Sequence, residues 1–227
     1  MRVLYTIMAS ALLAASVAHA EDVPKPTAPP PAAAQSDDPS KLVQTVAEAM
    51  LKDLDADRAT YRKDPSKVNA LVEKHLLPVF DTEYSARLVL GKHWRTATPE
   101  QRDRFVNAFY QSLLKNYGTA LADFTADRMK VYPSQIDPKS DNATVRTEIK
   151  RSNGERIPVN YTLHKTPEGW KAWDVVIEGI SYVKSFREDF GAEIDQKGLD
   201  AVIQRIEKGG LPQAPGTADS KKTAGKT

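Results

Sequence analysis

The sequence contains no cysteine in its 227 residues. Disulfide bridges, thiolate metal sites and the acylated cysteine of a lipoprotein anchor are therefore excluded. Long apolar runs are nearly absent as well. The one run, residues 3–17, is shorter than the ~20 apolar residues that a membrane-spanning helix requires. No segment is therefore expected to cross a membrane.

The N-terminus has the features of a secretory signal peptide. Arg2 precedes the apolar run, and Ala18, His19 and Ala20 form a small-x-small cleavage site before Glu21. Small secreted domains of eukaryotes often carry disulfides, so a signal peptide without cysteine favours a bacterial periplasmic protein. We predict a signal peptide at residues 1–20 and a mature protein in the periplasm.

The charges are nearly balanced, with 32 Lys and Arg against 30 Asp and Glu. This balance argues against nucleic acid as a partner, because phosphates require a concentrated basic patch. The Pro- and Ala-rich residues 21–39 and the basic residues 211–227 have little to bury and are predicted to be a disordered tether and tail. Residues 40–210 are predicted to form one folded domain, and we expect a monomer.

Helical periodicity dominates the first half of this domain. Apolar residues at spacing three and four predict helices at 40–54, 66–76, 80–90 and 98–121, and again at 182–190 and 199–206. Ser40 is the expected N-cap of the first helix. Thr98, Pro99 and Gln101 form the clearest helix start, because a threonine cap with glutamine three residues later satisfies free backbone amides.

Between these helical segments the period changes to two. Residues 129–132, 143–149, 157–163 and 170–178 alternate apolar and polar side chains, and Asn153-Gly154 favours a tight hairpin. Consecutive antiparallel strands with one apolar face need a cover, which the helices can provide. The sequence therefore predicts an α+β fold in which a twisted antiparallel sheet packs with several helices.

Residues 173–191 join the two periods. Val175 and Ile177 alternate as in a strand, whereas Val183 and Phe186 follow a helical spacing, and Gly179 lies between them. This joint is interpreted as closing one wall of an apolar cavity. Gly179 is either a hinge or a residue that adopts a positive φ in a fixed turn.

Metal sites are not supported by the sequence. The three histidines of the mature chain, His75, His93 and His164, are not paired at ligand spacing. Asp53, Asp55, Asp57 and Asp64 imitate a calcium loop, but Arg58 replaces the required glycine and Asp64 replaces the bidentate glutamate. Neither a G-x-S-x-G elbow nor a phosphate-binding glycine loop is present. We expect no cofactor.

Two carboxylates are candidates for acid–base chemistry. Asp174 and Glu178 lie at alternate positions of the last long strand, on the same predicted face. The other face carries Trp173, Val175 and Ile177, which need burial. Asp174 and Glu178 are therefore assigned to a solvated outer face.

Several motifs in one order carry a family resemblance. They are Leu90-Gly91, the segment from Ala97 to Arg102, Tyr117-Gly118 and Glu178-Gly179-Ile180-Ser181. Over residues 42–208 the chain resembles the MlaC, or toluene-tolerance, family of the maintenance-of-lipid-asymmetry pathway. The resemblance implies an NTF2-like sheet with helices and a deep apolar pocket that holds phospholipid tails. It also implies a carrier, not an enzyme, that shuttles lipid between an outer-membrane lipoprotein–porin complex and an inner-membrane ABC transporter complex.

The apolar faces supply candidate pocket residues: Phe109, Leu113, Tyr117, Val145, Tyr161, Val175, Ile177, Ile180 and Val183. The sequence alone does not distinguish a cavity wall from a solid core. Two alternatives stay open. One is an NTF2-like periplasmic enzyme that uses the same cavity, with Asp174, Glu178 or His164 as acid or base. The other is an adaptor with a solid core and no ligand.

Overall fold

The computed structural model describes residues 36–64, 66–122, 129–150 and 154–212, without the side chains of residues 62 and 117–122. The predicted signal peptide, most of the tether and nearly all of the tail lie outside these residues. The helices are α1 (Pro39–Ala56), α2 (Arg58–Lys63), α3 (Ser66–His75), the 3-10 helix η2 (Leu77–Val79), α4 (Thr82–Leu90), α5 (Lys92–Thr96), α6 (Pro99–Ala122), α7 (Tyr182–Lys197) and α8 (Leu199–Glu207).

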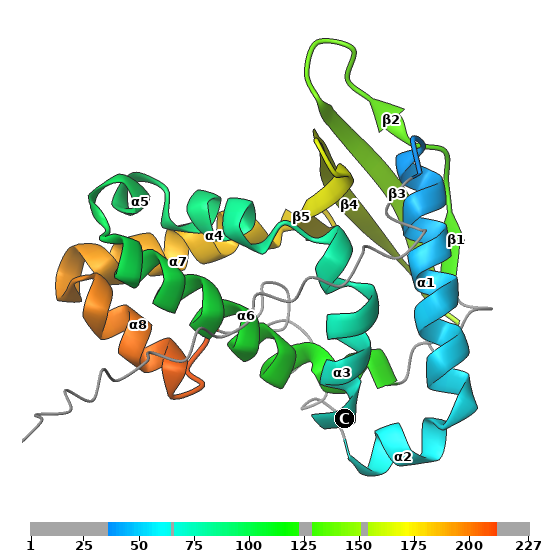
Figure 1. The fold of residues 1–227 in the computed structure, drawn as a ribbon, viewed down its shortest axis with the longest axis horizontal. Helices are drawn as coiled ribbons and strands as arrows, with labels where there is room; N and C mark the ends of the chain where they lie inside the picture. Colours follow the sequence, from blue (N-terminus) through cyan, green and yellow to red (C-terminus); the bar gives the residue numbers. More distant parts are fainter. Residues whose placement is uncertain (1–35, 65, 123–128, 151–153, 213–227) are drawn as a thin grey trace, which may run out of the picture.

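The strands form one antiparallel sheet, as predicted. They are β1 (Met129–Val131), β2 (Gln135–Ile136), β3 (Asn142–Lys150), β4 (Arg156–Thr166), β5 (Gly169–Ile177) and β6 (Ile180–Ser181). Their order is β1-β3-β4-β5-β6, and β2 also pairs with β3. The fold is therefore α+β, with the sheet at one side of the molecule and most helices at the other (Figure 1).

Helix α1 covers one face of the sheet, which we call the inner face. Leu42 and Val46 of α1 are buried in one cluster with Val145 of β3, Leu163 of β4 and Trp170 of β5. The indole nitrogen of Trp170 also donates a hydrogen bond to the carbonyl oxygen of Asp37, over 3.1 Å. The residues just before α1 are thus held against the start of β5.

A second apolar cluster lies among α4, α6, α7 and α8. Its centre is aromatic: the rings of Phe105 and Phe109 stack at 5.6 Å, and Phe186 and Phe190 stack at 5.8 Å. Phe109 meets Phe186 edge to face at 5.1 Å, an arrangement that aromatic quadrupoles favour. These contacts join the long helix α6 to α7, which follows the last strand directly.

The helix starts are set by local hydrogen bonds. The predicted capping box is confirmed, because Thr98 N–H donates to Gln101 Oε1 and Gln101 N–H donates to Thr98 Oγ1. At α1 the predicted cap was wrong. Asp38 caps the helix by accepting from Ser40 N–H at 2.9 Å, because Pro39 occupies the first helical position and so moves the cap to the residue before it.

Candidate functional site

Five of the nine predicted pocket residues come from the sheet, and the structure brings them together. Val145, Tyr161 and Val175 lie directly opposite one another on β3, β4 and β5. Ile177 pairs with Ile180 across the β5–β6 turn. Directly opposed residues share a sheet face, and so do residues two apart on one strand. These five side chains therefore form one patch on the inner face.

Burial decreases across this patch from β3 toward β6. Val145 is fully buried beneath α1, whereas Tyr161, Val175 and Ile177 are only partly buried. Ile180 is 38% exposed. The inner face thus carries a solid core at one end and an apolar surface that α1 does not fully cover at the other. Apolar side chains left in this state are typical of a ligand-binding wall.

The helical candidates lie in a different environment. Phe109 and Val183 are buried in the aromatic cluster of α4, α6, α7 and α8, and Leu113 packs against that cluster while partly buried. The side chain of Tyr117 lies outside the described residues. Phe109 and Val183 therefore support the helical layer, and their assignment to the pocket stays a prediction.

The prediction for Asp174 was wrong. Asp174 is only 4% exposed, and its carboxylate accepts hydrogen bonds from the hydroxyl of Ser181 at 2.6 Å and the backbone amide of Val183 at 3.0 Å. Helix α7 folds back on β5 and brings its free N-terminal donors to this strand face. Asp174 therefore anchors the start of α7.

The turn between β5 and β6 explains the glycine at the joint. Glu178 and Gly179 both have positive φ, 51° and 84°, as the two central residues of a type I′ hairpin turn require. A Cβ atom at Gly179 would have no heavy atom within 4 Å. The glycine is thus required by the backbone conformation and not by space, and a hinge at this position stays a prediction.

The other acid–base candidates do not converge on the apolar wall. His164 Nε2 lies 3.0 Å from Asp81 Oδ2, and its ring packs on Tyr84 at 4.4 Å. Asp81 also caps α4 by accepting from the amide of Tyr84. Glu178 is exposed at the turn. His164 and Asp81 therefore connect β4 to α4, and these groups do not form a shared proton-transfer site.

Two tyrosines at the sheet–helix boundary remain protonated at neutral pH. Burial raises the pKa of the Tyr161 hydroxyl, and burial together with the charge of Glu178 raises that of Tyr182. A neutral phenol places both a donor and an acceptor beside an apolar surface. The Tyr161 hydroxyl therefore adds an uncharged polar group to the apolar patch, whereas Tyr182 packs against the helical cluster.

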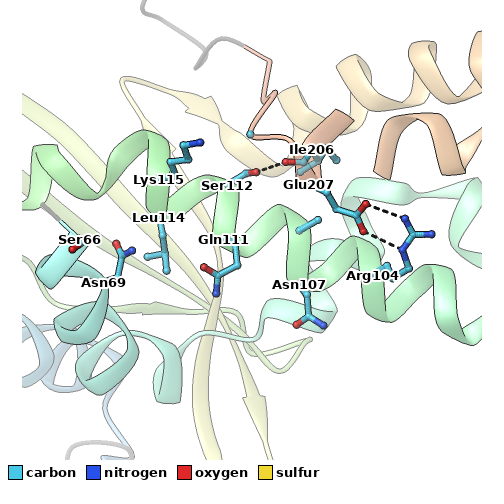
Figure 2. Close-up of a pocket in the computed structure, with 12 residues that line it drawn as sticks. Ser66, Asn69, Arg104, Asn107, Gln111, Ser112, Leu114, Lys115, Ile206 and Glu207 are labelled. Carbon is cyan, nitrogen blue, oxygen red and sulfur yellow. Dashed lines mark hydrogen bonds and ion pairs between the residues drawn. The ribbon is translucent and has the colours of Figure 1, made fainter. Parts of the chain in front are cut away.

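A separate cavity of about 670 Å³ lies between α3, α6 and α8 (Figure 2). Ala108, Leu114 and Ile206 contribute apolar surface to it, and Asn69 and Gln111 contribute amides. The eight predicted pocket residues with described side chains are not among those that line it. Sequence reasoning missed this cavity, because polar residues four apart on α6 are indistinguishable from a solvated helix face.

The described residues also bear on metal sites and on membrane-spanning helices. Within residues 36–64, 66–122, 129–150 and 154–212, no group of three or more His, Cys, Asp or Glu side chains could hold a metal ion. Asp53, part of the rejected calcium pattern, instead contacts Lys74 and His75. No helix in the same ranges is long and apolar enough to cross a membrane.

Comparison with known proteins identifies the family. A family model described as "MlaC protein" matches residues 44–208. The chain belongs to the MlaC family. Toluene tolerance protein ttg2D of Pseudomonas putida is 32% identical over 163 residues, 71% of this chain and 75% of that protein. The intermembrane phospholipid transport system binding protein MlaC of Haemophilus influenzae is 24% identical over 174 residues, covering 75% and 81% of the two chains.

A solved structure extends the likeness to the fold. The phospholipid-binding protein from Ralstonia solanacearum, determined in complex with a phospholipid, superposes with a TM-score of 0.68 at 25% identity. The match covers 74% of this chain and 93% of that one. The MlaC family resemblance and the α+β fold predicted from the sequence are therefore both confirmed.

Proposed function

We propose that this chain is a periplasmic phospholipid carrier. It holds acyl tails against the partly covered inner face of the sheet and keeps the headgroup in water. It shuttles lipid between an outer-membrane lipoprotein–porin complex and an inner-membrane ABC transporter complex, and so maintains outer-membrane lipid asymmetry. The phospholipid bound to the Ralstonia protein supports the ligand class.

The apolar patch on the inner face is the observation that carries the proposal. Tyr161, Val175 and Ile177 are adjacent apolar-bodied side chains that the described helices leave partly exposed, and Ile180 extends the patch to its exposed edge. A contiguous patch of this kind is less expected in a solid-core adaptor, because each buried methylene contributes about 0.8 kcal/mol. Bound acyl tails would supply the missing cover.

The energetics suit transfer between docked proteins. Two tails with about 30 methylenes at about 0.8 kcal/mol each represent roughly 24 kcal/mol relative to water. A bilayer offers the tails nearly the same environment, so the net free energy of transfer into the pocket is close to zero. Direct handover at a partner complex avoids exposing the tails to water.

The enzyme alternative has little support among the described residues. Asp174 is committed to the start of α7, and His164 to Asp81 and Tyr84. A general acid or base must lie within hydrogen-bond reach of the substrate. The side chain of Glu178 is instead exposed to solvent at the β5–β6 turn. We therefore favour binding without catalysis.

The decisive experiment is mass spectrometry of an organic extract from the purified native protein. The proposal expects phospholipid at about one molecule per chain, and native mass spectrometry should show the same complex intact. Delipidated protein should take up phospholipid from vesicles. A native protein that carries no lipid and takes none up would contradict the proposal and favour the adaptor.

A further inference from the structure

The cavity between α3, α6 and α8 has a polar rim that the proposed lipid pocket does not use. We call it the α3–α6–α8 groove. Its floor contains buried Ala108, Leu114 and Ile206. The floor is closed by the buried hydroxyl of Ser112, which donates to the carbonyl oxygen of Ile206 at 2.9 Å and holds α6 against α8.

Three neutral amide side chains converge on this groove. Figure 2 shows Asn107 and Gln111 projecting on the same side of α6, one turn apart, with Asn69 on the neighbouring helix α3. None of the three has a hydrogen-bond partner among the described residues. Each amide offers both a donor and an acceptor, which is the complement of a peptide group.

The spacing of these amides suits an extended chain. Side chains four apart on a helix are ~5–6 Å apart, and alternate residues of an extended strand are ~6.8 Å apart. Asn107 and Gln111 can therefore reach two peptide groups on the same side of one extended segment. Asn69 can reach that segment from α3.

The groove also carries one available cation. Lys115 has no ion-pair partner among the described residues. Its amine lies beside Gly209, because a Cβ atom built on that glycine would be 2.9 Å from the Lys115 Nζ. The other cation, Arg104, is already bound to Glu207 at 3.0 Å through two nitrogens and lies 3.6 Å from Asp200. The free charge therefore favours an acidic side chain in the occupant.

A lipid fits the groove less well than a polypeptide. The apolar floor is formed by few residues, and an acyl tail would leave the amides without partners, which is unfavourable wherever they lose water. A phosphate group would find only Lys115, because Arg104 is paired.

We propose that the α3–α6–α8 groove binds an extended segment of a partner protein, with an acidic side chain of that segment paired to Lys115. The inference rests on the proposed function in one respect, since a carrier that hands over lipid must dock with other proteins. Binding through backbone groups of an extended chain would make this docking tolerant of the exact partner sequence.

The test uses synthetic dodecapeptides selected from a random library on the full chain. Each selected peptide is made in two forms, with its Asp or Glu residue retained or replaced by the matching amide. We expect wild-type protein to bind the acidic form at least about tenfold more tightly, and the joint change Asn107→Ala and Gln111→Ala to weaken binding by about tenfold or more. Lys115→Met should abolish the preference for the acid. Gln204→Ala, on the exposed side of α8, is the matched control.

Backbone amide chemical shifts should change in α3, α6 and α8 when peptide is added. Three results would overturn the inference: no peptide selected above background, affinity unchanged in the double variant, or laurate displacing the peptide and binding in the groove itself. Phospholipid content is measured on the same samples. Normal lipid with no peptide binding defeats this inference alone, whereas peptide binding without lipid defeats only the carrier function.

Discussion

The buried carboxylate of Asp174 accepts a hydrogen bond from the hydroxyl of Ser181 over 2.6 Å. Ser181 in turn accepts from the amide of Lys184 and so caps α7. The last long strand and the first residues of the closing helix are therefore joined by one hydrogen-bonded network. This network includes Ser181 of β6, the residue after Ile180, so it positions one edge of the proposed lipid-binding wall.

Removal of the Asp174 carboxylate should destabilise the fold. In Asp174→Ala, the Ser181 hydroxyl and the Val183 amide both lose a buried acceptor, which costs about 2–3 kcal/mol in free energy of unfolding. Urea denaturation followed by circular dichroism measures the change. Glu178→Ala, in the exposed turn that follows the same strand, should shift stability by less than about 0.5 kcal/mol. Equal effects of the two substitutions would contradict the anchoring role.

Glu178 adopts an unfavourable backbone conformation in the β5–β6 turn. A non-glycine residue with φ near 51° occupies the left-handed region, which asparagine tolerates better than glutamate. Glu178→Asn should therefore raise the free energy of unfolding by about 0.5 kcal/mol. Gly179→Ala should lower it by about 1 kcal/mol, because φ is 84°. Thermal unfolding of both variants tests the turn, and a stabilised Gly179→Ala protein would contradict the requirement for glycine at this position.

Ile180→Glu tests the lipid-binding wall. A carboxylate in contact with acyl tails is strongly unfavourable, so phospholipid recovered per chain should fall on the order of tenfold or more. The fold should survive, since Ile180 is 38% exposed. Ile136→Glu is the matched control, because Ile136 is 53% exposed on β2, at the other end of the sheet. Normal lipid content in Ile180→Glu, measured by mass spectrometry, would remove this residue from the wall.

The cap of α1 predicts a specific dependence on pH. The hydrogen bond from the Ser40 side chain lowers the pKa of Asp38 below its usual 3.8. A lowered folded-state pKa contributes stability that is complete above the unfolded pKa and is lost as the pH falls through the folded value. Wild type should therefore lose stability relative to Asp38→Asn as the pH falls from 5 to below the folded pKa. Urea titrations at several pH values test this, with Asp37→Asn as the control. A constant difference would contradict the linkage.

Much of the fold could be predicted because the relevant signals are local. The capping box of Thr98 and Gln101 spans three residues, and it begins α6 as predicted. The alternation around Val145 and Tyr161 likewise placed both on one sheet face. Short elements such as α2, α5 and β6 were missed, since a few residues carry too little periodicity to identify them.

The candidate site was predicted less completely. Strict alternation assigned Trp173, Val175 and Ile177 to one face and Asp174 to solvent. The pairing of β4 with β5 shifts its register between Thr162 and Leu163. Trp173 packs against the helical cluster. A β-bulge of this kind adds one residue to a strand and changes the direction of its side chains. No pattern within β5 indicates where such a residue is added.

The sequence by itself determined the periods of the helices and strands, the antiparallel class of the sheet and the family. All of these depend on residue types and spacings along the chain. Only the tertiary structure decided that Asp174 is an anchor, that Ile180 lies at an exposed edge, and that Asn69 of α3 lines one groove with Asn107 and Gln111 of α6. These depend on contacts between elements far apart in sequence, such as Ser112 with Ile206. Such contacts are set by how apolar faces pack together.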